Sequence, residues 1–429
     1  MFFTPHKPQC YPQNPNPHAK IGFIIFYPFQ FYALKNIYAQ FKYEAEFIVH
    51  DSPREEIAGR GLRATVGLLR EKGVYFRILG GKRHASGEML KRFFSRYDAL
   101  VGLTFTYCCV RPERSSIRKI RVEYGAGKDL WKFHPLQSKL NSLLLYGERS
   151  AELYKFYTHY TIVGNTRFDD WFNDTLDRNF INKTRAQLDS SKKTIFYVPT
   201  HGELSFLDEL VYPLSSIKKR FNVIIKLHHR TICDEPQKIT SLREKGFTVF
   251  DDTTDSLPLY KIADVVLGDN SSALLEALLA KKPLVIADFF SKEFLEDHRI
   301  RFRHHKNKIL VPQTYSGSIE QQLKNKVAFC VKNPSELEKA LEHALASPDK
   351  FAAEREEITR KVFAFNDGRC SLRAKAAIEN FLALKEPPPK QILYYIFDAC
   401  VEETRIETME SIKKMTLFRK LKFIFQNLL

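Results

Sequence analysis

Polar side chains that can bind or move a phosphate group follow three apolar runs in the second half of the sequence. They are Thr200 and His201 after TIFYVP, His228 and His229 after NVIIKL, and Asp269, Asn270, Ser271 and Ser272 after DVVLG. Ser271 and Ser272 open a predicted helix, and the free N–H groups and positive dipole end of a helix start favour an anion such as phosphate. The alternative is that Asp269, Asn270 and Ser271 only cap this helix.

The pair His228 and His229 is singled out by its position at the end of a predicted strand. Neighbouring residues of a strand face opposite sides of the sheet, so we expect only one of the two to reach a ligand. We favour His228 as a hydrogen-bonding partner of a diphosphate, with Arg230 adding positive charge.

The other clustered histidines do not indicate a metal site. His298, His304 and His305 match no standard zinc spacing, and no cysteine or carboxylate lies at a matching interval. The segment RFRHHKNK, residues 301–308, is interpreted as a solvated basic loop that helps to attract an anionic substrate. We therefore predict no metal and no cofactor.

These residues can act together only if the fold brings the ends of distant strands close to one another. The alternation of strands and helices along the chain predicts such a fold. Apolar runs alternate with helical stretches from Ile21 to about Gly164, and the alternation returns from Thr194 onward. It predicts an α/β protein with two doubly wound, Rossmann-like sheets facing a cleft, where ligands lie at the carboxyl ends of the strands. We expect a flexible arm at residues 1–20, domains at 21–165 and 166–385, and a proline linker with a helical extension at 386–429.

The segment VGNTRFDD, residues 163–170, lies where the first unit gives way to the second. Asn165, Arg167 and Asp169 are therefore candidate hinge residues. On local grounds we expect Arg167 and Asp169 to pair with each other.

Composition narrows the class of protein. The 429 residues include 67 Lys and Arg against 50 Asp and Glu, a net charge of +17 that favours polyanions, phosphorylated substrates or an acidic membrane surface. We find no RNA-reading aromatic motif, zinc finger or dense basic tract, and we do not expect nucleic-acid binding. Seven cysteines without metal-like spacing indicate a reducing compartment, and the N-terminus lacks the features of a signal peptide.

The end of the sequence, TLFRKLKFIFQNLL, predicts a basic amphipathic helix. One arc of this helix carries large apolar side chains while basic residues point away, so we expect it to lie on an anionic membrane. The alternative is a helix that packs on its own domain or on a second copy of the chain. The apolar arc comprises Leu417, Phe418, Leu421, Ile424, Phe425 and Leu428.

Taken together, the segments resemble the CDP-glycerol glycerophosphotransferase family, the teichoic-acid-type polymerases and primases, which have a GT-B fold. The resemblance covers about Arg121 to Leu382. It is carried by VGNTRFDDW, YVPTHGE, IIKLHH, DDTTDSLPLYKIADVVLGDNSSALLEALLAKKPLV and FNDGRCSLRAKAAI, of which the last two are the most specific.

The resemblance implies an acceptor domain at 21–165 and a donor domain at 166–385. It implies that Thr200, His228, Ser271 and Ser272 contact the nucleotide diphosphate and that Asp269 shapes the turn. Asp367 and Arg373 look like the family's late Asp-Gly…Arg element near the same site.

Tyr124-Gly125-Ala126 stands where the family carries His-Gly-Thr, whose histidine is its presumed general base. Tyrosine is a poor base near neutral pH, since its ordinary pKa is about 10. If Tyr124 is not the base, His134 or His201 is the alternative.

The resemblance further implies the reaction. A hydroxyl group of a lipid-linked or glycan acceptor attacks the β-phosphorus of a CDP-activated alditol, and CMP leaves. The setting would be the cytoplasmic side of a bacterial cell membrane. Two alternatives are a GT-B sugar transferase or epimerase that uses a UDP-sugar, and a degenerate member that binds a donor without transferring it.

Overall fold

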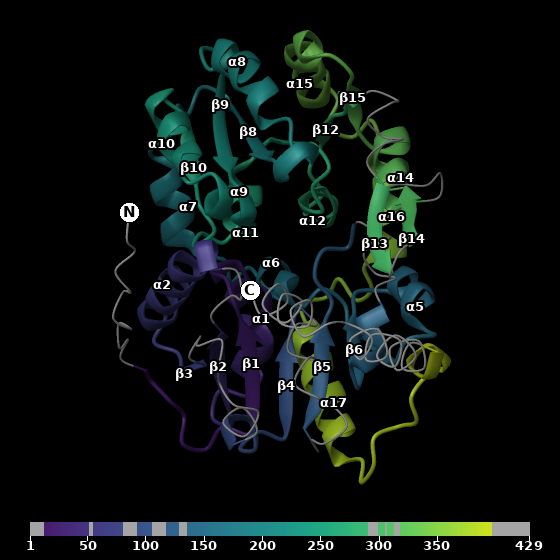
Figure 1. The fold of residues 1–429 in the computed structure, drawn as a ribbon. Coiled ribbons are helices and arrows are strands. Elements are labelled where there is room, and N and C mark those ends of the chain that lie inside the picture. The colour runs from purple at the N-terminus through teal and green to yellow at the C-terminus, as the bar shows by residue number, and fades with distance from the viewer. Residues whose placement is uncertain are drawn as a thin grey trace, which may run out of the picture.

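The computed structural model contains two α/β lobes and describes residues 13–50, 55–79, 92–104, 117–127, 135–290, 299–304, 307–312 and 318–396. In Figure 1 the purple and blue strands of the first half form the lower lobe, and teal and green elements form the upper lobe. Each lobe is built on a sheet of parallel strands with helices on its faces. The predicted fold class, two doubly wound sheets, is confirmed.

The lower lobe contains a seven-stranded parallel sheet in the order β3-β2-β1-β4-β5-β6-β7. Its interior strand β1, with the sequence IGFII, is buried at every position, because helices cover both faces of the sheet. The strands are β1 (Ile21–Ile25), β2 (Ala45–His50), β3 (Phe76–Leu79), β4 (Ala99–Gly102), β5 (Arg118–Val122), β6 (Ser142–Leu145) and β7 (His159–Ile162).

The upper lobe contains a six-stranded parallel sheet in the order β10-β9-β8-β11-β12-β15. The strand order reverses between β8 and β11, so this is the point at which such sheets bind ligands. The strands are β8 (Lys193–Val198), β9 (Phe221–Lys226), β10 (Thr248–Phe250), β11 (Val265–Gly268), β12 (Leu284–Ala287) and β15 (Phe329–Val331).

The helices connect successive strands and cover the sheets. Those of the lower lobe are α1 (Pro28–Gln40), α2 (Glu55–Glu71) and α5 (Glu148–Tyr154). Those that follow in the chain are α6 (Asp169–Phe172), α7 (Arg178–Arg185), α8 (Leu207–Ile217), α9 (His229–Asp234), α10 (Gln237–Glu244), α11 (Leu257–Ile262), α12 (Ala273–Leu279), α14 (Ile319–Lys326), α15 (Leu337–Ala346), α16 (Ala352–Val362) and α17 (Cys370–Ala383). Short 3-10 turns are η3 (Pro135–Lys139), η4 (Thr166–Phe168), η5 (Gly202–Leu204) and η6 (Pro334–Glu336).

Helix α17 returns from the upper lobe and packs on the lower one. Ala374, Ile378 and Phe381 belong to the buried cluster that also contains Phe23 and Phe47 of the first sheet. The predicted division at residues 165 and 166 therefore places in the second domain a helix whose apolar face lies against the first sheet.

The start of α17 is fixed at the junction between the lobes. The carboxylate of Asp169 accepts hydrogen bonds from the backbone N–H groups of Cys370, at 2.8 Å, and Ser371, at 2.6 Å. Gly164 adopts a φ of +83°, and a Cβ there would lie 2.5 Å from the Ala364 carbonyl oxygen and from Cys370 Sγ. Only glycine fits this close approach.

The structure describes only parts of three segments that the sequence singled out: the N-terminal arm, the basic loop and the C-terminal amphipathic segment. Within the predicted arm, Asn16 is buried and its N–H group donates to Glu46 at 2.8 Å, whereas residues 1–12 lie outside the described part. Of the expected basic loop at 301–308, residues 301–304 and 307–308 instead lie in two antiparallel strands, β13 (Arg299–His304) and β14 (Asn307–Pro312), and residues 305–306 lie outside the described part. The amphipathic segment around Leu417 lies outside the described residues, and within them no helix has the length and apolar character needed to cross a bilayer.

Candidate functional site

A cavity of about 130 Å³ lies between the two lobes, at the carboxyl ends of strands from both sheets. From the lower lobe it is lined by α1, by the loop after β5 and by the end of β6. From the upper lobe it is lined by the ends of β8 and β9, the segment 252–256 and the start of α12. Six residues predicted from the sequence line it: Tyr124, Asn165, Arg167, His228, Ser271 and Ser272.

Stacked rings cross this cavity from one lobe to the other. His201 and His228 stack with ring centroids 4.3 Å apart, and His228 lies 4.2 Å from His229. His229 stacks on Phe29 of α1 at 4.3 Å, and Phe29 lies 5.0 Å from Tyr124. These rings, here called the ring ladder, join three imidazoles of the upper lobe to aromatic rings of the lower lobe.

His228 and His229 both line the cavity, so the expectation that only one of them reaches it is wrong. That expectation assumed that both residues continue the strand, but β9 ends at Lys226 and α9 begins at His229. His228 is the N-cap of α9, and its Nδ1 accepts a hydrogen bond from the Arg230 N–H group at 3.2 Å. At a strand-to-helix turn, two successive side chains can point to the same side.

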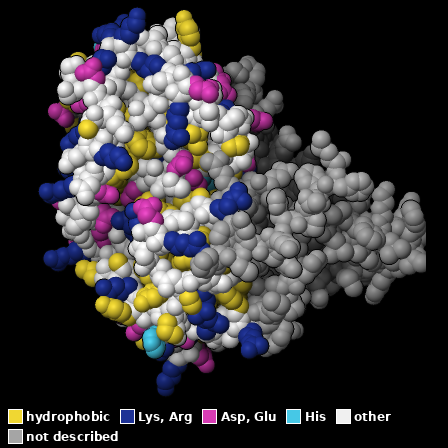
Figure 2. All heavy atoms as spheres, turned by 90° about the vertical axis from the view of Figure 1, so that its left-hand side faces the viewer, with side chains coloured by type: hydrophobic (Ala, Val, Ile, Leu, Met, Phe, Trp, Pro, Cys, Tyr) yellow, Lys and Arg dark blue, Asp and Glu magenta, His cyan; other side chains and the backbone are white. Residues whose placement is uncertain are grey.

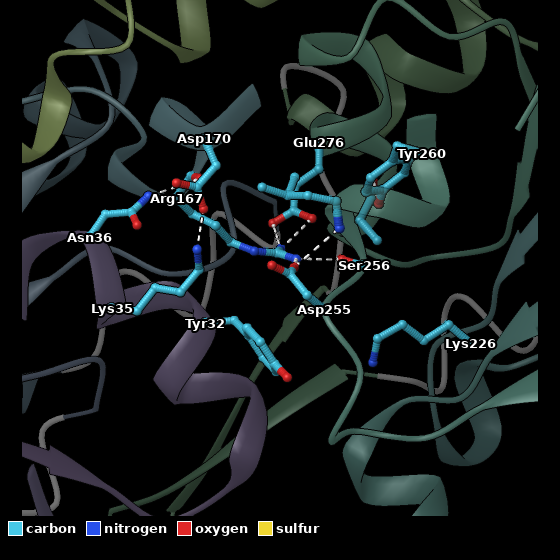
Figure 3. A network of polar contacts seen from close by, with 12 residues as sticks. Tyr32, Lys35, Asn36, Arg167, Asp170, Lys226, Asp255, Ser256, Tyr260 and Glu276 are labelled. Carbon is cyan, nitrogen blue, oxygen red and sulfur yellow. Dashed lines mark hydrogen bonds and ion pairs between the residues drawn. The ribbon is translucent and has the colours of Figure 1, made fainter. Parts of the chain in front are cut away.

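Arg167 forms the centre of a polar network on the wall of the cavity (Figure 3). Its guanidinium donates to both carboxylate oxygens of Glu276 at 2.8 Å, to Asp255 at 2.5 Å and to the Ser256 hydroxyl at 2.6 Å. Burial alone would lower the pKa of Arg167, but Glu276 and Asp255 outweigh it and raise the pKa well above its ordinary value. The predicted pairing of Arg167 with Asp169 is wrong, because Asp169 caps α17 instead.

Two buried hydrogen-bond donors that line the cavity have no partner among the described residues: Nδ2 of Asn165 and Nε of Arg167. The Oδ1 atom of Asn165 accepts from the Arg167 N–H group, which fixes the orientation of the amide. Buried polar groups in folded proteins are nearly always satisfied, so these two nitrogens, which solvent does not reach, are exceptions.

Lys226 adds positive charge to the same cavity. It is the last residue of β9, and its Nζ donates to the Asp251 carbonyl oxygen at 3.1 Å. Burial lowers the pKa of Lys226, while the nearby carboxylate of Asp252 acts in the opposite direction. A phosphate group would favour the charged form of this lysine.

Ser271 and Ser272 lie where the upper lobe approaches the loop after β5. Helix α12 begins at Ala273, and its N-cap Ser272 makes no side-chain capping hydrogen bond, while the Ala273 N–H group donates to the Ser271 hydroxyl at 3.3 Å. A Cβ at Gly125, whose φ is +72°, would lie 3.3 Å from the Ser272 hydroxyl. The lower lobe therefore covers this helix start closely.

Asp269 shapes the turn that follows β11, which is the role that the resemblance implied for it. It is 1% exposed and accepts hydrogen bonds from the backbone N–H groups of Thr200, at 2.8 Å, and Phe206, at 3.3 Å. Its carboxylate thus ties the loop after β8 to the end of β11. Thr200 contributes its backbone to this tie and does not line the cavity.

Tyr124 is poorly suited to accept a proton. It lies against Phe29 at the mouth of the cavity, and loss of solvation, followed by the charge of Glu276, raises the pKa of its hydroxyl above the ordinary value of 10. A base needs the opposite shift at neutral pH.

The remaining predicted residues do not line the cavity. The guanidinium of Arg230 pairs with Asp234, and the Asn270 amide donates to the Leu204 carbonyl oxygen at 3.4 Å. Asp367, on the turn before α17, and Arg373, in the first turn of α17, form a two-pronged ion pair at 2.8 and 2.5 Å. His134 lies outside the described residues.

Sequence reasoning missed Lys226 and Glu276 as cavity residues, passed over His229 in favour of His228, and did not find Asp255, which binds Arg167 beside the cavity. Lys226 lies two residues before His228 at the end of a predicted strand, and this position could have identified it as a candidate. Asp255 and Glu276 lie 88 and 109 residues from Arg167, so nothing local in the sequence indicates their contact.

No protein-family model matches the sequence, and no curated protein matches it significantly. Solved structures do match. A variant of the wall teichoic acid polymerase TagF soaked with CDPG has a TM-score of 0.59 at 14% identity, covering 86% of this chain and 89% of that one. The Neisseria meningitidis UDP-GlcNAc 2-epimerase bound to UDP-GlcNAc has a TM-score of 0.52 at 14% identity, with 84% and 100% covered. The S. aureus MnaA–UDP structure has a TM-score of 0.52 at 14% identity, with 87% and 99% covered. These similarities establish the fold, which is GT-B.

Proposed function

We propose that this chain, a GT-B protein similar in fold to a wall teichoic acid polymerase, transfers glycerol phosphate or a related alditol phosphate. The donor is the CDP-activated alditol, the acceptor is a hydroxyl group of a membrane-linked or glycan molecule, and CMP is released. The observation that carries the proposal is the cavity between the lobes, which brings Lys226, His228, Ser271 and Ser272 together at the carboxyl ends of parallel strands.

The chemistry of the cavity suits a diphosphate. In the proposed step the acceptor oxygen bonds to the β-phosphorus, the bond from that phosphorus to the bridging oxygen breaks, and CMP leaves with the bridging oxygen. Lys226, His228 and the hydroxyl groups of Ser271 and Ser272 would bind the phosphate oxygens. Fixed donors in a site shielded from water stabilise such charge without reorganising during the reaction.

The proton of the acceptor hydroxyl must go to a base other than Tyr124, whose pKa is raised. The sequence offers His134 and His201, and the structure adds His229, which lines the cavity. Separate substitution of each of these three histidines by glutamine identifies the base, because only the base variant shifts the acidic limb of the pH–rate profile.

The test of the donor site is His228→Asn, which removes the imidazole but keeps a side-chain acceptor for the Arg230 N–H group. Purified protein is incubated with CDP-glycerol and a bacterial lipid extract, and CMP is measured by mass spectrometry. We expect His228→Asn to lower CMP release by about 100-fold or more while the protein stays folded. His343→Asn on α15, outside the cavity, is the matched control. Full activity of folded His228→Asn, or no CMP from the wild type, would overturn the proposal.

A second candidate is a sugar transferase or epimerase that uses a UDP-sugar. It is favoured by the epimerase structure bound to UDP-GlcNAc, which shares the fold over 84% of this chain. Calorimetric titration of one protein sample with CDP, UDP and GDP separates the two candidates. Tighter binding of UDP than of CDP would replace the alditol proposal with this one.

The proposed setting is the cytoplasmic face of a bacterial cell membrane, in the synthesis of a cell-surface polymer such as a capsule or a teichoic-acid-like polymer. The basis is the basic amphipathic sequence at residues 416–429. Deletion of residues 391–429 is expected to abolish sedimentation with liposomes that contain anionic lipid. Unchanged sedimentation would show that another part of the chain, or none, meets the membrane.

A further inference from the structure

The last described part of the chain docks on the lower lobe. After α17 and the prolines at 387–389, Leu393 packs against the buried cluster to which α5 contributes. The Leu393 N–H group donates to the Phe156 carbonyl oxygen at 3.4 Å, and Lys390 Nζ donates to the Leu140 carbonyl oxygen at 2.7 Å. In Figure 1 this yellow end of the chain runs up from α17 and stops near α5. The proline run is therefore followed by a segment that the lower lobe holds in place.

The docked segment turns an apolar stripe outward. Residues 392–396 are helical, and Ile392, Tyr395 and Ile396 follow the i, i+3, i+4 spacing that places side chains on one face of a helix. Their exposed fractions are 60%, 57% and 52%, whereas Leu393 between them is partly buried against the lobe. One side of this helix thus holds it to the protein, and the other presents large apolar side chains to its surroundings.

The stretch that the docked segment contacts adds two more exposed rings. Phe156 follows α5 and Tyr160 lies on β7, the edge strand of the first sheet, with exposed fractions of 54% and 40%. Grouped apolar side chains on a protein surface mark a contact with a membrane or with another protein. The five residues are here called the edge face: Phe156, Tyr160, Ile392, Tyr395 and Ile396.

The charges beside the edge face are positive. Neither residues 155–160 nor residues 389–396 include an acidic residue. The Nζ atom of Lys155 lies 5.1 Å from the centroid of the Phe156 ring, and those of Lys139 and Lys390 lie 4.6 and 5.2 Å from that of Tyr394. Rings at the level of lipid headgroups, with lysine ammonium groups reaching the phosphates, are typical of membrane-bound surfaces.

The opposite side of the molecule has a different character. Figure 2 shows that side, and its apolar side chains are interspersed with both acidic and basic ones. Such a mixture suits contact with water. The edge face therefore differs from it both in the grouping of its apolar side chains and in the sign of the charges beside them.

The chain that continues from the edge face has the same chemistry. Residues 411–429 include five Lys and Arg and no acidic residue, together with the apolar arc of the predicted amphipathic helix. An anionic bilayer suits the apolar side chains and the lysines of both stretches at once. We propose that the edge face lies on the surface of an anionic lipid bilayer. The inference rests on the proposed function only for its membrane setting, and it adds that the lower lobe, the proposed acceptor lobe, itself touches the lipid in a fixed orientation.

The test keeps the full chain, including residues 391–429. Phe156→Ser combined with Tyr395→Ser removes two exposed rings of the edge face. The matched control combines Tyr43→Ser with Tyr212→Ser, whose rings are 75% and 84% exposed elsewhere on the two lobes. Sedimentation is measured with vesicles of phosphatidylcholine, with and without phosphatidylglycerol, and the affinity for CDP is measured by calorimetry without vesicles.

A second pair of variants reports contact at the position itself. Tyr395→Trp and, as its control, Tyr212→Trp each add one indole, and the fluorescence of the wild type, which has two tryptophans, is subtracted. A blue shift on addition of vesicles, with quenching by brominated lipid, shows that the indole enters the bilayer. Emission is also recorded over a range of protein concentrations without vesicles, which reports burial against a second copy of the chain.

We expect the Phe156→Ser and Tyr395→Ser variant to bind anionic vesicles at least about tenfold more weakly than the wild type, and the control to bind as the wild type does. Tyr395→Trp should shift and be quenched, and Tyr212→Trp should do neither. Equal sedimentation of the two double variants would overturn the inference, as would a wild type that binds no vesicles or a shift of Tyr395→Trp that depends on protein concentration alone. The expected vesicle results together with no binding of CDP would retain the edge face and refute the proposed donor.

Discussion

Arg167 connects three segments that are distant in the sequence, and only 11% of its side chain is exposed. Removal of one partner from a buried ion pair leaves the remaining charge unsatisfied, at a cost of about 3–5 kcal/mol. We expect Arg167→Met to lower the free energy of unfolding by about that amount. Urea denaturation followed by circular dichroism measures the change.

Arg220 provides the control for this prediction. It also contacts two carboxylates, those of Glu338 and Glu342, but 57% of its side chain is exposed. Solvent and salt screen such a pair, so Arg220→Met should cost much less than Arg167→Met. Equal losses in the two variants would show that burial does not determine the contribution of Arg167.

Asp367 gives a prediction about pH. Its hydrogen bonds with Arg373 lower the pKa of its carboxyl group from 3.8 to about 2. Because the folded pKa lies below the unfolded one, the pair stabilises the protein fully above pH 4 and loses this contribution as pH falls toward 2. Asp367→Asn should therefore cost less than about 1 kcal/mol at pH 6, since the pair is partly exposed, and progressively less as pH falls from about 4 through 2.

The measurement compares urea midpoints of the wild type and Asp367→Asn from pH 6 down to the acid transition. The two curves should converge below pH 4. A constant difference between them at all these pH values would mean that Asp367 acts through something other than its charge.

At the residue scale, sequence reasoning found side chains that follow strand ends and missed those that meet across lobes. Tyr124, His228, Ser271 and Ser272 line the cavity because each lies just after a parallel strand. Arg230 was predicted from its proximity to His228, yet a carboxylate one turn later in α9 holds its guanidinium. Local order in the sequence does not reveal which way a long charged side chain turns.

The junction between the lobes gives a prediction at the scale of elements. Gly164 combines a φ of +83° with contacts of 2.5 Å from any added Cβ to the segment before α17. We expect Gly164→Ala to destabilise the protein by about 2–5 kcal/mol, the sum of backbone strain and overpacking. Thermal and urea unfolding measure this loss.

Gly202 is the control that separates backbone strain from overpacking. Its φ is +61°, but a Cβ there would meet nothing within 4 Å. Gly202→Ala should therefore cost only about 1–2 kcal/mol from backbone strain. If Gly164→Ala cost no more than Gly202→Ala, the close contact with α17 would be unimportant.

Strands within a clear alternation of apolar runs and helical stretches were predicted, whereas β6, β7, β13 and β14 were not. The central strands β1, β8 and β11 are nearly continuous apolar runs, which parallel sheets require. Strands β6 and β7 have only four residues each, and the three leucines of β6 fit a helix as well as a strand. The hairpin of β13 and β14 is rich in basic residues, a composition that is also typical of a loop.

At the scale of the whole molecule, the ring ladder holds the lobes together over a cavity of about 130 Å³. This volume is below the roughly 300 Å³ of the smaller ligand pockets, so the proposed nucleotide donor would fit only after the lobes separate. We expect Phe29→Ala to increase the radius of gyration and to speed CDP association. Small-angle scattering and stopped-flow fluorescence measure the two effects.

Tyr43→Ala serves as the control for this variant. Tyr43 also belongs to the lower lobe, is 75% exposed and lies outside the cavity. Tyr43→Ala should change neither the radius of gyration nor the rate of CDP association. An unchanged radius of gyration with slower association in Phe29→Ala would mean that the ring contributes to the binding site and does not hold it shut.

The two-lobed architecture followed from the repeated alternation of strands and helices, but the position of α17 did not. Its sequence, CSLRAKAAIENFLA, has an apolar face that would suit either sheet. Only the tertiary structure, through the Asp169 cap and the close approach at Gly164, shows that this face meets the first sheet.

The return of α17 has a consequence for how the protein is made. A ribosome releases the chain from its N-terminus, so Ala374, Ile378 and Phe381 emerge after every strand of both sheets. The apolar surface that they cover on the first sheet must stay open to water, or be held by a chaperone, throughout synthesis of the upper lobe. The lobe that is translated first is thus the last to be completed.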